Sequence, residues 1–337
     1  MKTNNRITHS RSRTPWDGKD DRELSELELF IRDEYKSHYK EHHPELAAEN
    51  EAAFLNSIRL AECKYCDSKQ IKLKGFDKNG IQRYQCYHCG KTFTVLTNTI
   101  FENHKIPLSE WIEYLLNLFG YASNNLNSKT NKNSPTTSKY WMAKVFLVLQ
   151  EYQNDITLDG NVYIDETYHS VVASEVVYKD GKKLRGISRN KICIATGTDG
   201  NKSFFILAGR GKLTKNKAMA AYVPHITAGS YLIHDNENSH IRIIEELHLD
   251  HIVYNSKEIK KLPDKDNPLR PINNLHSLLK KFLRSHSGFS REELQGYLNL
   301  FAFIVNGPEN KLEKVELFLK MALLGKQKLQ YRVYYSK

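Results

Sequence analysis

"CKYCDSKQIKLKGFDKNGIQRYQCYHCGKTF", residues 63–93, is the stretch that decides the first part of the fold. Its cysteines form two Cys-x-x-Cys pairs, Cys63 with Cys66 and Cys86 with Cys89. Two short strand patterns lie between the pairs, and Asn79-Gly80 at their junction is typical of a type I′ hairpin turn. A hairpin with a cysteine pair at each end presents four thiolates to one Zn²⁺ ion, and four sulfurs leave no position for water. We therefore predict a structural zinc ribbon; the alternative is four unrelated structural cysteines.

The bulk composition indicates a globular protein with an anionic partner. Of 337 residues, 40% are hydrophobic, and 50 Lys and Arg outnumber 39 Asp and Glu for a net charge of +11. A basic surface favours a polyanion, of which nucleic acid is the commonest. We find no apolar run of membrane-spanning length and no signal core near the N-terminus, so we expect a cytoplasmic protein without a membrane partner. Clustered cysteines fit metal binding in a reducing compartment.

Four segments follow one another along the chain. We expect a basic tail and helical region over 1–58, the zinc ribbon over 59–100, and a helical pair over 101–158. In that pair "SEWIEYLLNLF" and "YWMAKVFLVLQEY" flank a polar linker, a pattern that fits a helix-turn-helix but also a plain packing hairpin. Residues 159–337 alternate strands and helices, which predicts a mixed α/β sheet covered by helices.

Two aspartates in the last segment occupy unusual positions. Asp165 lies within the strand pattern "NVYIDETYHSVV", and Asp235 ends the apolar strand "SYLIHD". Burying a carboxylate is costly unless a cation or hydrogen-bond donors compensate it. If the two strands are neighbours, both carboxylates meet at one edge and can bind Mg²⁺ for phosphoryl transfer. Taken singly, Asp165 is equally well explained as a surface residue and Asp235 as a helix N-cap.

The chain resembles the zinc-ribbon, ISXO-like group of DDE transposases from bacterial insertion sequences. The motifs that carry the resemblance span about 60–306 and are "CKYC…CYHCGKTF", "LTNTIFENHKIPLSEWIEYL", "VYIDETY", "LIHDN" and "NNLHSLLKKFL…GYLNLFAF". The resemblance implies a ribonuclease H-like catalytic domain. It also implies a third ligand on the helix pattern "PINNLHSLLKK", where most DDE transposases have Glu and this chain has Asn273. One branch of the group shows an Asp-Asp-Asn-Lys pattern with a His-Ser pair between Asn and Lys, as at His276-Ser277.

The resemblance implies that Asp165, Asp235 and Asn273 hold Mg²⁺ or Mn²⁺. It implies that His276 binds a substrate phosphate or helps to place the second metal, and that Lys280 contacts a DNA phosphate. Water would cut at the transposon end, and the freed 3′-hydroxyl would attack target DNA. Double-stranded DNA would be the partner, bound by a homodimer or larger assembly. Its expected phosphate contacts, each more often only a solubilising charge, are Lys72, Lys74, Arg83, Lys91 and Lys280. Without the resemblance, the stripe of Asn273, His276 and Lys280 is better explained as the solvated side of a helix. Two rival functions remain open, a non-catalytic DNA-binding regulator and a structure-specific nuclease.

Overall fold

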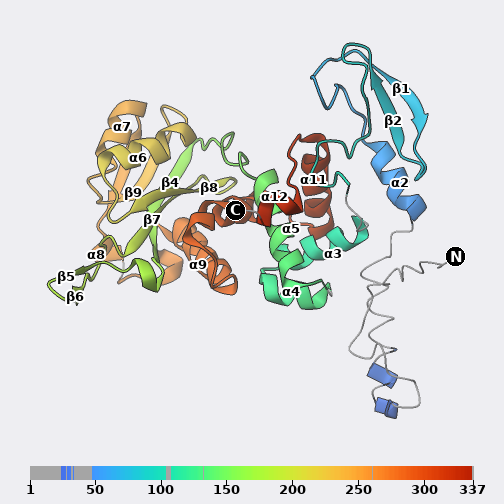
Figure 1. Ribbon diagram of the computed structural model, residues 1–337. Helices are drawn as coiled ribbons and strands as arrows, with labels where there is room; N and C mark the ends of the chain where they lie inside the picture. The colour runs from blue at the N-terminus through green and yellow to red at the C-terminus, as the bar shows by residue number, and fades with distance from the viewer. Residues whose placement is uncertain are drawn as a thin grey trace. The chain divides into compact units, whose positions relative to one another are not determined.

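The computed structural model describes residues 24–27, 29–31, 33, 48–103, 108–131, 133–259 and 261–335. The predicted basic tail lies outside these residues. The chain divides into two compact units, one formed by 1–144 with 310–337 and the other by 145–309 (Figure 1). This division differs from the predicted boundary at 159, and it groups the C-terminal helices with the N-terminal unit because α11 (Lys311–Leu324) packs on α3 (Leu108–Phe119). In the described part of the chain, no helix is both long and apolar enough to span a bilayer.

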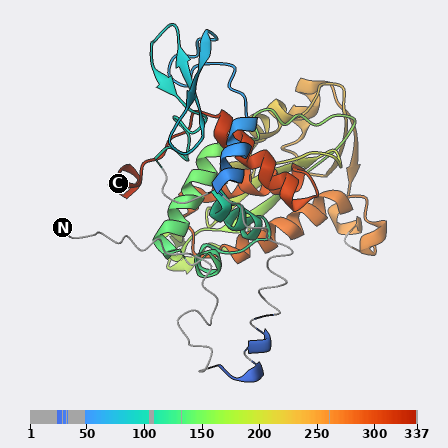
Figure 2. The same cartoon turned by 90° about the vertical axis from the view of Figure 1, so that its right-hand side faces the viewer.

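The cysteine segment of the first unit folds as a three-stranded antiparallel sheet, which we call the ribbon (residues 63–93; Figure 2). Its strands, in the order β1-β2-β3, are β1 (Ile71–Phe76), β2 (Gln82–Cys86) and β3 (Thr92–Phe93). Tyr84 stacks on Phe93 with ring centroids 5.7 Å apart, and both rings are buried against the cysteines. Even a sheet this small therefore has an apolar core, supplied by one of its two faces.

The hairpin predicted between the cysteine pairs is confirmed, but its predicted turn type is wrong. A type I′ turn needs positive φ at both central residues. Gly80 has φ +76°, whereas Asn79 is not among the positive-φ residues of the described chain. Asp77 forms a wider loop instead, since its Oδ1 accepts hydrogen bonds from the backbone N–H groups of Asn79 at 2.8 Å and Ile81 at 2.9 Å. A side chain that caps its own loop in this way competes with the two-residue turn.

The remaining described elements of the first unit are helical. They are α2 (Ala48–Ser57), α3, α4 (Asn124–Thr130), α5 (Pro135–Val148), α11 and α12 (Tyr331–Tyr335). Trp111 of α3 stacks on Trp141 of α5, with centroids 4.2 Å apart and planes 13° from parallel. The polar linker expected between these two helices is not a plain turn: it contains α4, which begins where the Ser123 side chain accepts a hydrogen bond from the Leu126 N–H at 3.2 Å. N-capping explains why so polar a sequence is helical.

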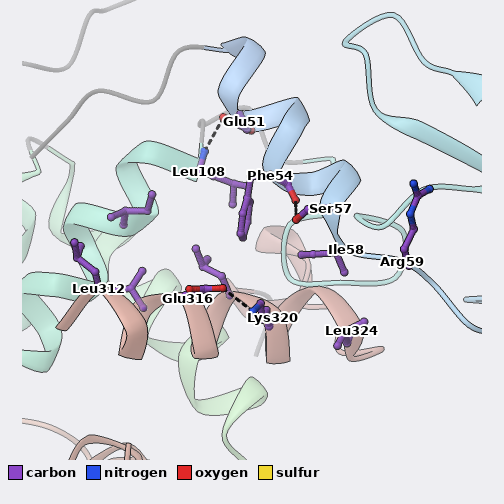
Figure 3. Close-up of a pocket in the computed structure, with 13 residues that line it drawn as sticks. Glu51, Phe54, Ser57, Ile58, Arg59, Leu108, Leu312, Glu316, Lys320 and Leu324 are labelled. Carbon is purple, nitrogen blue, oxygen red and sulfur yellow. Dashed lines mark hydrogen bonds and ion pairs between the residues drawn. The ribbon is translucent and has the colours of Figure 1, made fainter. Parts of the chain in front are cut away.

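A groove of about 680 Å³ lies between α2, α3 and α11 (Figure 3). Most of its lining is apolar, and three of its charged side chains pair within the protein. The Glu51 carboxylate accepts a hydrogen bond from the Leu108 N–H at 3.2 Å, and Glu316 pairs with Lys320 at 2.6 Å. The groove is a seam between packed helices, and we assign it no chemistry.

Lys64, inside the first cysteine pair, ties the ribbon to the end of α11. Its buried ammonium donates to the carbonyl oxygens of Leu323 at 2.6 Å, Leu324 at 3.0 Å and Gly325 at 2.9 Å. The last carbonyls of a helix have no partners within the helix and carry its negative dipole end. A lysine is therefore well suited to this position. Lys326, just beyond, pairs with Glu62 at 3.0 Å and also with Asp67.

We expect Lys64→Met to lower the unfolding free energy of the first unit by about 2 kcal/mol, because three helix-end carbonyls lose a charged donor while the aliphatic volume is kept. Trp111 and Trp141 stack within this unit, so tryptophan fluorescence in a urea titration monitors its unfolding. Lys69→Met, at an exposed position nearby, is the matched control. Equal urea midpoints for the two variants would contradict a stabilising role of Lys64 at the end of α11.

The second unit is built on a five-stranded mixed sheet in the order β10-β9-β4-β7-β8. Its strands are β4 (Asn161–Ser170), β7 (Lys191–Thr198), β8 (Ser203–Arg210), β9 (Tyr231–Asp235) and β10 (Asp250–Tyr254). β4, β7 and β8 run antiparallel, and β9 and β10 run parallel to β4. The predicted mixed sheet is therefore present. A separate hairpin pairs β5 (Tyr178–Lys179) with β6 (Lys182–Lys183).

Helices cover both faces of this sheet (Figure 1). On one face, α6 (Lys215–Tyr222) and α7 (Ile241–Leu247) bury Val162, Ile164 and Leu232. On the other, α9 (Arg270–Ser285) packs on β4 and β7, and α10 (Leu294–Asn306) packs on β8. The shorter helical segments are η2 (Ala173–Glu175), η3 (Val223–His225), α8 (Ser256–Ile259), η4 (Asp264–Asp266) and η5 (Arg291–Glu293). Strand alternation thus divides the side chains of β4 between the α6/α7 face and the α9 face.

Candidate functional site

Asp165 and Asp235 lie near the same end of two adjacent parallel strands. The pairing of β4 with β9 aligns Asn161 with Tyr231 and Tyr163 with Ile233, and each aspartate lies two residues beyond this last pair. The charge of Asp235 contributes to the raised pKa of Asp165, so the two carboxylates are close in space. Tyr163 and Ile233 belong to the apolar cluster beneath α9. Because side chains alternate along a strand, both carboxylates project from this same face. The parallel pairing is the tertiary feature that brings together two aspartates far apart in the sequence.

His276 of α9 faces this carboxylate pair. Its Nδ1 lies 3.6 Å from the Asp165 Oδ2, and the imidazole is buried with 6% of its surface exposed. Its Nε2 is also buried and has no hydrogen-bond partner among the described residues. The hydrophobic side of α9 supplies Ile272, Leu279 and Phe282 to the core, so packing sets the rotation of the helix that turns His276 inward. The alternative of a uniformly solvated helix stripe therefore does not hold for His276.

The electrostatics of the pair favour a cation. Burial, together with the neighbouring carboxylates of Glu166 and Asp235, raises the pKa of Asp165 to about 7. His276 does not compensate this charge, because burial, with a contribution from Lys280, lowers its pKa to about 4 and leaves it neutral near pH 7. Two adjacent carboxylates in a desolvated site are a donor set that fits a hard divalent ion. Such an ion would relieve the repulsion that raises the Asp165 pKa.

The other two members of the helix stripe lie at the surface. Asn273, one turn before His276, is exposed, and so is Lys280, one turn after it. Lys280 is near enough to His276 to lower its pKa, which places its charge beside the site. The structure thus brings Asp165, Asp235, His276 and Lys280 together on one side of the sheet, with Asn273 on the same helix.

Glu166 faces the opposite side of the sheet, within a buried network that the sequence did not reveal. Its Oε1 lies 2.9 Å from His240 Nε2 and accepts a hydrogen bond from the Tyr222 hydroxyl at 2.9 Å. The His240 Nδ1 lies 3.1 Å from the Nδ1 of His234, the residue before Asp235. Burial alone would raise the pKa of Glu166, but the hydrogen bonds and charge of its partners lower it overall. The network connects β4 and β9 on the sheet face opposite the two aspartates. Its one sequence signal is the pair of histidines that flank "DNENS".

The four ribbon cysteines converge on one point. Their sulfurs all lie within 4.8 Å of one another, and the Cys63–Cys89 and Cys66–Cys86 separations are both 3.7 Å. A tetrahedral zinc site with bonds of about 2.3 Å requires sulfurs about 3.8 Å apart. Asp67 and Gly90, which follow the two pairs, both have positive φ and donate to the carbonyls of Cys63 and Cys86, so each pair forms the same tight turn. The predicted convergence of the four cysteines is confirmed, and its dimensions fit zinc.

The basic residues predicted to contact DNA divide between two surfaces of the ribbon. Lys72 pairs with Gln85 across β1 and β2, and Lys74 donates to the Thr92 hydroxyl at 3.2 Å. Arg83 alternates with buried Tyr84, so it shares this outer face. Lys91 lies elsewhere, with its ammonium 4.5 Å from the centre of the Tyr65 ring. Lys72, Lys74 and Arg83 therefore form a continuous basic face, and Lys91 does not belong to it.

Comparisons with known proteins identify only distant similarity. No family model and no curated protein matches the chain. Similar solved structures include the Mos1 strand transfer complex, with 12% identity over 65% of this chain and 77% of that chain at a TM-score of 0.28. A pre-cleavage Mos1 transpososome matches with 10% identity over 68% and 82% at 0.26, and a simian T-cell lymphotropic virus intasome in complex with PP2A regulatory subunit B56 gamma with 10% over 57% and 67% at 0.27. These matches assign no family. Such scores are too low to establish a common fold.

Proposed function

We propose that this protein is a DNA transposase that cuts and joins strands by metal-dependent phosphoryl transfer. The single observation that supports the proposal is that Asp165 and Asp235 each lie two residues beyond the last pair of the parallel strands β4 and β9, with the His276 Nδ1 3.6 Å from Asp165. We further propose that the second unit is a ribonuclease H-like domain, because three antiparallel strands followed by two parallel ones form its sheet in the order β8-β7-β4-β9-β10. Membership of the zinc-ribbon, ISXO-like group and a cytoplasmic location are part of the same proposal.

The side chains have distinct proposed roles. Asp165 and Asp235 hold the divalent ions, and Asn273 offers a neutral carbonyl oxygen as a third ligand. When bound, two Mg²⁺ or Mn²⁺ ions supply charge stabilisation at the attacking and leaving oxygens. His276, whose Nδ1 lies 3.6 Å from the Asp165 carboxylate, helps to place the second ion, and Lys280 contacts a DNA phosphate at the surface. Each displacement forms one P–O bond and breaks another, and the leaving 3′-oxygen takes up a proton.

The first unit would bind the transposon ends. Its ribbon carries the basic face of Lys72, Lys74 and Arg83, and Cys63, Cys66, Cys86 and Cys89 would hold a structural Zn²⁺ ion beneath it. The helices α3, α4 and α5 are the proposed helix-turn-helix region. Pairing of two ends requires at least a homodimer on double-stranded DNA.

The test is strand cleavage by the purified full chain on duplexes that carry the inverted repeats flanking its gene, with scrambled ends and a four-way junction as controls. The proposal predicts nicks at the 3′ ends of the repeats in Mn²⁺, followed by joining to target DNA. Binding without any cleavage would identify a regulator, and a preference for the junction would identify a structure-specific nuclease; either result refutes the transposase.

Asn273 should set the metal requirement of the reaction. We expect the wild-type protein to need millimolar Mg²⁺ or to prefer Mn²⁺, because an amide is a weaker ligand than a carboxylate for a hard ion. Asn273→Glu should lower the half-saturating Mg²⁺ concentration on the order of tenfold, since ligand charge count tunes affinity. Exposed Asn274→Glu, next along the helix, is the matched control. Cleavage by the wild type that already saturates at micromolar Mg²⁺ would show that Asn273 is not a limiting ligand.

A further inference from the structure

A strongly basic hairpin projects from the second unit between β4 and β7, and sequence reasoning assigned it no role. Residues 178–191 contain one carboxylate, Asp180, and six cations. The cations are Lys179, Lys182, Lys183, Arg185, Arg189 and Lys191. Among the described residues none of the six is ion-paired, and all are exposed except Lys191, which is half-buried and donates to the Ser170 hydroxyl. Figure 1 shows β5 and β6 extending away from the sheet. We call residues 178–191 the basic hairpin.

The tip of the basic hairpin is a two-residue turn of defined shape. Asp180 and Gly181 have φ values of +50° and +70°, as a type I′ turn requires. The strand pairing places Lys179 directly opposite Lys182. Like charges at directly opposed positions destabilise a hairpin, and a hairpin with two residues in each strand has little stability of its own. The arrangement therefore costs folding energy, and an anionic partner that bridges the two ammonium groups would offset that cost.

The base of the basic hairpin is held rigidly to the catalytic strand. The buried side chain of Asn190 accepts a hydrogen bond from the Val177 N–H at 2.6 Å and donates to the carbonyls of Val177 at 2.9 Å and Leu184 at 3.1 Å. The Val171 N–H, just after β4, donates to the Asn190 carbonyl at 3.2 Å. Asn190 thus joins the two arms of the hairpin through its side chain, and it joins them to the end of β4 through its backbone carbonyl. The cations extend from a hydrogen-bonded base.

The distance between Asp165 and the base of the basic hairpin fits binding of both to one DNA duplex. β4 ends at Ser170, five residues beyond Asp165, which is about 17 Å along a strand. That length is about half a turn of B-form DNA. The base of the basic hairpin therefore lies within about half a turn of B-form DNA from Asp165, which is within the span of one short duplex.

We propose that the basic hairpin is a second DNA-binding element, which grips the phosphate backbone of the duplex on which the aspartates act. It binds phosphates without reading bases, because its reach comes from lysine and arginine charges. The DNA partner rests on the proposed function, but the hairpin's contribution to binding is measured independently of cleavage.

The test is the salt dependence of binding to a fluorescein-labelled B-form duplex, measured by anisotropy with the full chain. The hairpin variant combines Lys179→Gln, Lys182→Gln and Lys183→Gln. Each phosphate contact contributes about 0.9 to the slope of log K against log salt, so the slope should fall by roughly 2 to 3. Affinity near physiological salt should fall by about tenfold or more.

The control variant combines three exposed lysines elsewhere in the same unit, Lys202→Gln, Lys215→Gln and Lys257→Gln. It changes the net charge equally and should leave the slope within error. Asn190→Ala keeps every charge but frees the arms, and it should weaken binding while circular dichroism reports an intact sheet. Equal slopes for the hairpin and control variants would overturn the proposal.

Other polyanions are separate arms of the same experiment. A hairpin effect confined to single-stranded RNA or to phosphatidylserine vesicles, with none on the duplex, would also overturn it. If the wild type never cleaves DNA but the hairpin variant loses duplex binding, the inference stands while the proposed chemistry fails.

Discussion

Asp165→Asn should abolish strand cleavage and leave DNA binding unchanged. The substitution keeps the shape of the side chain and removes a charge that the divalent ions require, a loss of several kcal/mol of transition-state stabilisation, or about 10³-fold in rate. Asp235→Asn should behave alike, because its carboxylate is near enough to Asp165 to raise the pKa of that residue. The measurement is the single-turnover rate of end cleavage in Mn²⁺, with anisotropy for binding.

Stability separates this loss from misfolding. Burial and the carboxylates of Glu166 and Asp235 disfavour the charged form of Asp165 and raise its pKa. The neutral side chain of Asp165→Asn should therefore not lower the melting temperature. Asp250→Asn, at an exposed carboxylate on the edge strand of the same sheet, is the matched control and should cleave normally. Full activity in Asp165→Asn would end the two-metal interpretation.

Removing zinc should unfold the ribbon. Structural zinc in isolated finger peptides contributes about 10–16 kcal/mol, more than a three-stranded sheet of this size gains from its own core. We expect Cys63→Ser to lose bound zinc, measured as metal per chain by mass spectrometry, and to lose protection of the β1 and β2 amides in hydrogen exchange. Lys64 should then release the end of α11, so that exchange also rises at Leu323 to Gly325.

Cys193→Ala is the matched control for the zinc experiment. Cys193 is fully buried in β7, and burial raises the pKa of its thiol to about 12. The Cys193→Ala variant should retain one zinc ion per chain. Retention of zinc and of amide protection in Cys63→Ser would contradict the four-sulfur site.

The limits of prediction from sequence are visible at particular residues. The spacing of the four cysteines was sufficient to predict their convergence, because two Cys-x-x-Cys turns at the ends of a hairpin have few ways to fold. Because side chains alternate along a strand, the neighbours Asp165 and Glu166 lie on opposite faces of β4, as the structure shows. This alternation did not reveal that Glu166 ends in a buried network with Tyr222 and His240, since those partners come from α6 and the start of α7.

Local composition predicted the wrong structure at two places where a side chain hydrogen-bonds to nearby backbone groups. Asn79-Gly80 has the composition of a type I′ turn, but the Asp77 carboxylate builds a wider loop. The polar residues after α3 lack hydrophobic periodicity, yet Ser123 starts α4 among them. In both places one hydrogen-bonding side chain outweighs the pattern of its neighbours.

The sequence by itself determined the features that depend on short-range geometry: the cysteine turns, the periodicity of strands and helices, and the face of β4 on which each carboxylate lies. Only the tertiary structure decided that β9 pairs in parallel with β4, and that α9 turns His276 toward Asp165. The physical reason is that both arrangements depend on packing between segments that are distant in the chain. The register of each pairing is set by the core that the two segments bury together, so neither segment determines it alone.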